Sequence, residues 1–332
     1  MEVGFFYWPF NVDLTLQLAA AAERWGYDMI GVADTPGNAM DPWISATLVA
    51  QNTKRPKVSL CVTNLNSRHP AASAAAIASL DLIANGRAII GIGAGNSGTK
   101  NLGVGGSKAA QLKEGVGYIR ELLHGRPASW NGASAHLPWV KRAPKVFQAA
   151  SLPVSLEAAG EAADGVFINY GLDAISLNAS AGHVATGAAR AGRTIEDLEI
   201  WQIACLDCHD DRLLARNKIG AILAFVSGYV IGKGDLAARG VPELYIGPLL
   251  ELRSRYSTRP GDVDARMVDS LGLFDYLSER LSIWGNPEDC LRQALAAKAA
   301  GAKRLMFTVS LAADPVRTVN LFGEHVLPAL RR

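Results

Sequence analysis

The chain has 332 residues, of which 49% are hydrophobic, and 33 Lys and Arg residues against 31 Asp and Glu residues give a formal net charge of +2. This balance, with no basic cluster longer than Lys141-Arg142, argues against nucleic acid or a membrane surface as a partner. No apolar run approaches the ~20 residues of a spanning helix, the N-terminus resembles a strand and not a signal peptide, and the sparse cysteines suit a reducing compartment, so we expect a cytoplasmic protein.

Short apolar segments alternate with helical segments along almost the whole chain. The expected strands are Val3–Trp8, Met29–Ala33, Val58–Thr63, Ile89–Gly93, Lys145–Ala149, Val166–Asn169, Leu198–Cys205 and Arg304–Val309. The expected helices are Asp13–Trp25, Pro42–Asn52, Pro70–Ala84, Ser107–Leu123, one from Pro153, Ala174–Ala191, Leu213–Val226 and one from Pro315. This alternation predicts an α/β fold, a (β/α)8 TIM barrel with a parallel sheet.

Two insertions interrupt the alternation, one after the fourth strand and one before the eighth. Residues 126–143 contain Trp130, Asn131-Gly132 and Trp139, a pattern typical of a loop or small hairpin. Residues 228–285 are longer and rich in Gly, Arg and Tyr. Since neither composition nor repeats mark a second domain, we predict a single barrel domain over residues 1–332.

The glycines that follow the fourth strand, in Gly93-Ala94-Gly95-Asn96-Ser97-Gly98, match the pattern GxGxxG. A Rossmann dinucleotide site needs a helix that begins within this motif, whereas here more glycines follow and the helix is expected only from Ser107. We favour a strand end whose backbone lies against a planar ring, because glycine leaves the space that a side chain would fill. A flexible loop or lid over residues 98–106 is the alternative.

A second motif, Cys205-Leu206-Asp207-Cys208-His209, matches the CxxCH signature of c-type haem attachment. The motif begins inside an expected strand, while haem attachment needs an accessible loop. A zinc site would need a second Cys/His pair nearby, which the sequence lacks. We therefore expect no metal, with Cys205 in the core and the following residues starting a helix through an aspartate cap.

Several segments, taken together in their order and spacing, resemble the bacterial luciferase-like family of flavin oxidoreductases over most of the chain. The segments are Trp25-Gly26-Tyr27-Asp28 with Val32-Ala33-Asp34, Val62-Thr63-Asn64 with Arg68-His69-Pro70, Leu80-Asp81 with Gly86-Arg87 and Gly91–Gly95, Leu156–Gly160 with Ala163–Val166, and Gly285–Glu288 with Ala300–Ala302. The resemblance implies a barrel that binds FMN, or the deazaflavin coenzyme F420 of a related branch, at the C-terminal rim. It also implies a homodimer.

Cofactor-binding candidates lie at the ends of the third to sixth strands. Ser151 precedes Pro153 at the start of a helix, where free amides bind phosphate, and the family uses this turn near the cofactor phosphate. A plain turn is the alternative for this segment and for residues 169–171. The full set is Thr63, Asn64, Ala94, Gly95, Asn96, Ala150, Ser151, Asn169, Tyr170 and Gly171.

The candidate catalytic residues are Asp34, His69 and Asn96. Asp34 ends the second strand and so faces the catalytic rim, with helix capping as its alternative role. His69 is a general acid or base candidate, or a cap for the helix that begins at Pro70. In the deazaflavin branch, the resemblance implies a histidine where this chain has Thr35 and often a glutamate where it has Asn96. These neutral side chains suit oxygen chemistry better than proton transfer.

Tyr7, Trp8 and Phe10 leave the first strand and are candidates for the substrate wall, with core packing as the alternative for Tyr7. We expect these aromatics, the 126–143 loop and the 228–285 insertion to form the substrate pocket.

The expected function is an FMN-dependent monooxygenase that oxygenates a small organic substrate with O2, using reduced FMN from a separate flavin reductase. The alternative is hydride transfer by a coenzyme F420-dependent oxidoreductase. A third hypothesis is a flavin-binding barrel without catalysis.

Overall fold

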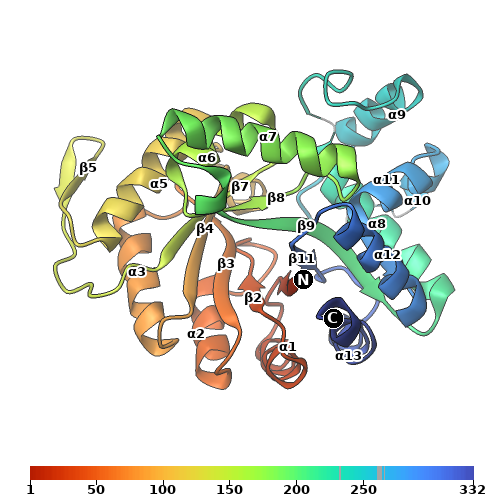
Figure 1. Ribbon diagram of the computed structural model, residues 1–332, viewed down its shortest axis with the longest axis horizontal. Helices are drawn as coiled ribbons and strands as arrows, with labels where there is room; N and C mark the ends of the chain where they lie inside the picture. The colour runs from red at the N-terminus through yellow and green to blue at the C-terminus, as the bar shows by residue number, and fades with distance from the viewer. Residues whose placement is uncertain (232, 260–263, 265) are drawn as a thin grey trace.

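The computed structural model describes residues 1–231, 233–259, 264 and 266–332 (Figure 1). Positions 232, 260–263 and 265, all within the predicted 228–285 insertion, lie outside the described residues. Among the described residues, eight parallel strands close into a barrel, because β1 pairs with both β2 and β11 and β8 pairs with β9. In barrel order they are β1 (Glu2–Tyr7), β2 (Met29–Val32), β3 (Lys57–Asn64), β4 (Ala88–Gly93), β7 (Lys145–Ala150), β8 (Gly165–Ile168), β9 (Glu199–Cys208) and β11 (Arg304–Thr308). The predicted TIM barrel is confirmed.

Helices surround the barrel on its outer face, as Figure 1 shows. They are α1 (Val12–Trp25), α2 (Pro42–Asn52), α3 (Pro70–Ile83), α5 (Ala109–Leu123), α6 (Pro153–Ala162), α7 (Ala174–Arg190), α8 (Arg212–Val230), α12 (Pro287–Ala299) and α13 (Pro315–His325), with α14 (Leu327–Leu330) at the end. None of the helices in the described part of the chain is both long and apolar enough to cross a membrane.

Local sequence explains where these helices begin and end. Asn11 accepts a hydrogen bond from the Leu14 amide at the start of α1, and Gly26 ends that helix with a φ of 72°, a conformation that glycine adopts without strain. Asp41 caps α2 through the amides of Trp43 and Ile44. Pro42 and Pro70 occupy first turns, where a missing N–H costs nothing.

Two hydrophobic layers hold the barrel together, because side chains alternate between the two faces of each strand. One cluster fills the barrel interior and includes Met29, Cys61, Ile89, Phe147, Phe167, Trp201 and Met306. A larger cluster lies between the strands and the outer helices. Tyr7 belongs to this outer cluster and is completely buried.

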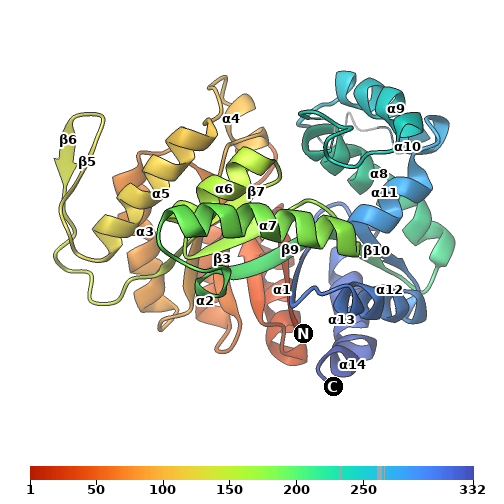
Figure 2. The same ribbon diagram turned by 45° about the horizontal axis from the view of Figure 1, so that its top comes forward.

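The 228–285 insertion forms a group of helices at one side of the barrel, together with the end of α8 (Figure 2). It contains α9 (Glu243–Ser254), α10 (Arg266–Ser270), α11 (Phe274–Leu281) and an additional strand, β10 (Ser282–Gly285). Cys205 pairs with Thr308 of β11 on one flank and with Ser282 of β10 on the other. Because a strand residue has one neighbour on each flank, β10 continues the β8 side of β9 beyond the end of β8.

The 126–143 segment contains a small hairpin, β5 (Ala128–Trp130) and β6 (Ala133–Ala135), as the sequence predicts. The hairpin follows α5 and precedes β7, so it lies at the N-terminal end of the barrel strands. Figure 2 also shows it on the side far from α9–α11. The expectation that this segment lines the substrate pocket is wrong, since the loops that follow strands build the other end.

Candidate functional site

Asp34 and Thr63 come together at the C-terminal rim of the barrel. Asp34 lies just beyond the end of β2, and Thr63 lies near the end of β3. The Thr63 hydroxyl donates to Oδ2 of Asp34 at 2.6 Å. Burial raises the pKa of Asp34 above its ordinary value and Asp41 adds to this effect, while the bond from Thr63 and the charge of Arg68 oppose it. A half-buried carboxyl with a raised pKa is suited to proton exchange with a ligand.

The fourth-strand loop packs directly against Asp34 and Asn64. The side-chain oxygen of Asn64 accepts from the amides of Asn66 and Ser67 at 2.9 and 2.8 Å. A Cβ at Gly98 would lie 2.8 Å from the Asp34 carbonyl oxygen, so only glycine permits this approach. The GxGxxG segment forms a short helix, α4 (Ser97–Lys100), which the sequence did not predict.

The conformation of Gly95 serves the loop itself. Its φ is +84°, and a Cβ there would lie 2.3 Å from the methyl carbon of Thr99. The Ala94 carbonyl accepts from the Ser107 amide at 2.7 Å. A large side chain at Gly95 would therefore disturb the loop before it reached any cofactor.

Asn96 contacts the insertion, because its side-chain amide donates to the Tyr256 hydroxyl. The Tyr256 ring packs on Phe225 with ring centres 5.7 Å apart, and Phe225 packs on Trp8 at 5.3 Å. The ring centres of Phe10 and Trp8 lie 6.0 Å apart, and Phe10 is 41% exposed. Two of the three predicted substrate residues thus join an aromatic wall, whereas buried Tyr7 favours the core-packing alternative.

Hydrogen bonds connect this aromatic wall to two rim loops, through the side chains of Asn38 and Asn101 and through Thr258. Asn38 donates to the Thr35 hydroxyl at 3.1 Å and to the Thr258 carbonyl at 2.8 Å. The Thr258 hydroxyl donates to the Asn101 side chain at 2.8 Å. The insertion therefore contacts the loops that follow β2 and β4 at the barrel mouth, and Thr35 holds the first of these loops.

The predicted phosphate-binding turn lies at the start of α6. Its N-cap is Leu152, whose side chain cannot accept a hydrogen bond and whose own amide donates to the Ser155 hydroxyl at 3.1 Å. Since Pro153 has no N–H, the amides of Val154 and Ser155 are the ones left for another acceptor. The carbonyl of Ser151 accepts from Nη2 of Arg239 at 3.2 Å. The Asn169 amide bonds to the Ala150 carbonyl at 3.2 Å, which brings the ends of β7 and β8 together.

Tyr170 and Gly171 contact two arginines that the sequence did not single out. Nε of Arg280 donates to the Tyr170 carbonyl at 3.2 Å, and Arg239 lies over the Tyr170 ring at 5.1 Å from its centre. Both arginines come from the insertion, and the only sequence signal for them is its richness in Arg and Tyr. A phosphate-bearing cofactor fits this turn, because open helix amides and cationic side chains meet there.

His69 is exposed and caps α3, its Nδ1 accepting from the Ala71 amide at 3.2 Å. Arg68 lies over the Trp43 ring at 5.2 Å. The capping alternative for His69 is therefore present in the structure, and its catalytic role stays a prediction.

The CxxCH motif lies within β9, and Cys205 and Cys208 are buried free thiols. The expectation that residues after Cys205 start a helix is wrong, because pairing with β10 extends the strand to Cys208. Asp211 caps α8, which begins at Arg212. Within the described residues, no group of three or more His, Cys, Asp or Glu side chains could hold a metal ion.

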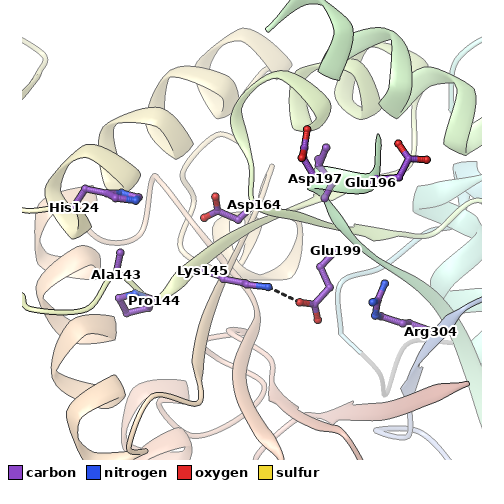
Figure 3. A pocket seen from close by; sticks show the side chains of 10 residues that line it. His124, Ala143, Pro144, Lys145, Asp164, Glu196, Asp197, Glu199 and Arg304 are labelled. Atoms are coloured by element: carbon purple, nitrogen blue, oxygen red, sulfur yellow. Dashed lines mark hydrogen bonds and ion pairs between the residues drawn. The ribbon is translucent and has the colours of Figure 1, made fainter. Parts of the chain in front are cut away.

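A charged hollow of about 400 Å³ lies at the opposite end of the barrel (Figure 3). Its wall includes Lys145 and Glu199, the first residues of β7 and β9, together with Asp164 and Arg304. Nζ of Lys145 lies 2.8 Å from Glu199. Residues at the N-terminal ends of barrel strands support stability, since catalytic groups of this fold lie at the other end.

Comparisons with known proteins agree with this geometry. The chain is 27% identical to a 5,10-methylenetetrahydromethanopterin reductase of Methanolobus tindarius over 93% of this chain and 94% of that protein. It is 26% identical to the F420-dependent glucose-6-phosphate dehydrogenase of Amycolatopsis mediterranei over 95% and 94%. The solved coenzyme F420-dependent tetrahydromethanopterin reductase of Methanopyrus kandleri superimposes with a TM-score of 0.77, covers 99% of both chains and is 23% identical.

These relatives are oxidoreductases, and this chain is an enzyme of the same general class. A family model described as luciferase-like monooxygenase matches residues 4–304. With the closed barrel, the rim carboxyl and this match over most of its length, the chain belongs to the luciferase-like monooxygenase family.

Proposed function

We propose that this protein is a coenzyme F420-dependent oxidoreductase that transfers a hydride between the deazaflavin and a small organic substrate. The observation that carries the proposal is similarity over more than nine tenths of the chain to proteins named for reactions of this kind. This similarity favours hydride transfer with coenzyme F420 over oxygenation by an FMN monooxygenase.

When bound, the deazaflavin would supply or accept the hydride. The side chains of this protein would handle the accompanying proton, and Asp34 is placed to do so. Thr63 engages Oδ2 of Asp34, which leaves Oδ1 for a substrate oxygen or nitrogen. Because its pKa is raised, Asp34 retains its proton at a higher pH than an exposed aspartate does, so it could exchange a proton closer to neutral pH.

Binding and exclusion of water would fall to the rim loops and the insertion. We assign the cofactor to the ends of β3, β4, β7 and β8, with its phosphate at the α6 turn. Trp8, Phe225 and Tyr256 would form an apolar cover for the reacting groups. A dry pocket strengthens the electrostatic interactions that orient the substrate.

The FMN monooxygenase is the second candidate, and the neutral side chains of Thr35 and Asn96 favour it. That reaction would need O2 and reduced FMN from a separate reductase. The structure gives both residues positioning contacts, to Asn38 and Tyr256 respectively. A homodimer remains part of both proposals.

The two candidates are separated by binding and by oxygen dependence. The purified protein is titrated with coenzyme F420 and with FMN, each in its oxidised and reduced form. We expect micromolar binding of coenzyme F420 and turnover of a small test substrate, such as an alcohol or aldehyde, without oxygen. Preferential binding of reduced FMN, with turnover only in the presence of O2 and a flavin reductase, would reject the proposal in favour of the monooxygenase.

A further inference from the structure

Arg239 and Arg280 are buried cations that lie on the same tyrosine. They are 7% and 8% exposed, and their guanidinium carbons lie 5.1 and 5.9 Å from the centre of the Tyr170 ring. Arg239 follows α8 in the insertion and Arg280 ends α11. The insertion therefore brings two positive charges to the end of β8, next to the α6 turn.

Among the described residues, neither arginine is paired with a carboxylate at ion-pair distance, although the charge of Arg280 lowers the pKa of the nearby Asp173. The nearby Asp173 is already engaged at the start of α7, where it accepts from the amide and the hydroxyl of Ser176 at 2.8 and 2.6 Å. Asp173 is thus one carboxylate at longer range for two buried positive charges. Buried charges without full compensation are costly, so this arrangement favours an anionic ligand.

Both guanidinium groups also keep unused donors. Nη1 of Arg239 donates to the carbonyls of residues 230, 231 and 233, and its Nη2 donates to the Ser151 carbonyl. Its buried Nε has no hydrogen-bond partner among the residues that the structure describes. Arg280 uses Nε for Tyr170 and Nη1 for the Tyr276 hydroxyl, and within the described residues its Nη2 has no acceptor. Unused donors on two converging arginines suit an acceptor with several oxygens.

Other cations strengthen the positive field on this side of the mouth. Burial lowers the pKa of Lys233, and the charges of Lys100 and Arg253 lower it further. The carbonyl of Lys233 accepts from Arg239 at 2.8 Å, which joins this group to the buried pair. The field would attract an anion and hold it close to the amides that begin α6.

We propose that Arg239 and Arg280, together with the first amides of α6, bind a phosphate or carboxylate group beside Tyr170. The inference rests on the proposed function, and it assigns to the 228–285 insertion the recognition of an anion. The anion belongs either to the cofactor or to the substrate, and the two sources are distinguished by the ligands tested.

The test compares coenzyme F420 with its nucleoside form, which has the deazaflavin ring but no phosphate. Arg280→Met should weaken coenzyme F420 binding by about tenfold or more and leave binding of the nucleoside unchanged, because only the first ligand carries the anion. Arg280→Lys, which retains the charge, should recover part of the affinity. Arg239→Met gives a second test, and Arg216→Met is the control, because Arg216 pairs with Asp269 on the outer surface.

The remaining outcomes also decide the question. If the variants bind coenzyme F420 normally but lose inorganic phosphate binding to the F420-loaded protein, the site exists and its anion comes from the substrate. Equal weakening of both deazaflavins, or unchanged binding of coenzyme F420 and phosphate in variants of normal melting temperature, would overturn the inference. If the wild-type protein binds neither deazaflavin, the proposed function fails, and the same comparison made with FMN and riboflavin tests the anion site independently.

Discussion

Replacement of Glu199 by Gln should destabilise the N-terminal end of the barrel, opposite the candidate site. Glu199 is 9% exposed and accepts from Nζ of Lys57 at 2.5 Å, from Nζ of Lys145 at 2.8 Å and from Nε1 of Trp201 at 2.9 Å. These contacts join β3, β7 and β9, so one carboxylate links three strands. The neutral amide would remove the anion that the two lysines share, and Lys57 would keep only its longer contact with Glu2, at 3.6 Å.

The magnitude follows from the pKa of Glu199. Burial alone would raise this pKa, but hydrogen bonds from Lys145, Lys57 and Trp201 outweigh burial and lower it from 4.5 to about 2. A difference of about 2.5 pKa units, at about 1.36 kcal/mol per unit, corresponds to at most about 3.4 kcal/mol of stability at neutral pH. The side chains of Lys57 and Lys145 are 34% and 54% exposed, so solvent screens part of this electrostatic stabilisation. We therefore expect Glu199→Gln to lose about 2 kcal/mol of stability.

Urea denaturation of the wild type and of Glu199→Gln gives the measurement, repeated from pH 7 downward. The carboxylate has a lower pKa in the folded than in the unfolded state, so its contribution is complete above about pH 4.5 and disappears toward pH 2. The difference between the two proteins should therefore shrink as the pH falls below 4.5. Glu121→Gln is the control, since its pair with Arg126 is exposed to solvent and should contribute much less than the Glu199 contacts. Equal stability at pH 7, or a difference that stays constant down to pH 3, would refute this reasoning.

Variants at four further positions test the rim. Asp34→Asn should slow turnover by about 10²-fold or more in steady-state kinetics, with cofactor affinity unchanged in a parallel titration. Thr63→Val removes a bond that lowers the pKa of Asp34, so the limb of the pH–rate profile that reports Asp34 should move to higher pH. Ser151→Asp should weaken cofactor binding by about tenfold, or 1.4 kcal/mol, because the new carboxylate repels the ligand's anion and neutralises Arg239; unchanged affinity would place the phosphate elsewhere. His69→Ala should cost about 1 kcal/mol of stability by removal of the α3 cap, and His69→Asn should restore it. A turnover loss of about 10²-fold that persists in His69→Asn would establish the catalytic role.

The barrel was predictable because its signals are local. Each strand is a short apolar run between helix-ending and helix-starting residues, such as Gly26 before β2 and Asp41 before α2. The rim position of Asp34 follows directly, since a residue after a barrel strand lies at the catalytic end. The other strand ends lie within one residue of the prediction, whereas β9 runs three residues further, to Cys208, because the distant strand β10 pairs with it.

The insertion was not predictable, because long-range contacts determine its structure. Nothing in the local sequence around Arg239 or Arg280 indicates that both meet Tyr170, a contact formed across 110 residues for Arg280. The same holds for Tyr256, which reaches Asn96 across 160 residues. For the 126–143 hairpin, the local structure was predicted from the sequence, but its position was not. That position, at the N-terminal end of the barrel strands, follows from its place between α5 and β7 and not from its aromatic residues.

The strand β10 makes the insertion part of the barrel wall, and this constrains how the protein can be re-engineered. Ser282 to Gly285 pair in register with Cys205 to Cys208, and the Gly285 carbonyl accepts from the His209 amide at 2.9 Å. An insertion exchanged with that of a relative would have to carry its own version of this strand and preserve the register. Chimeras with junctions on the outer sides of β9 and β10 should therefore fold, whereas junctions between α11 and β10 would separate the helices from the strand that anchors them.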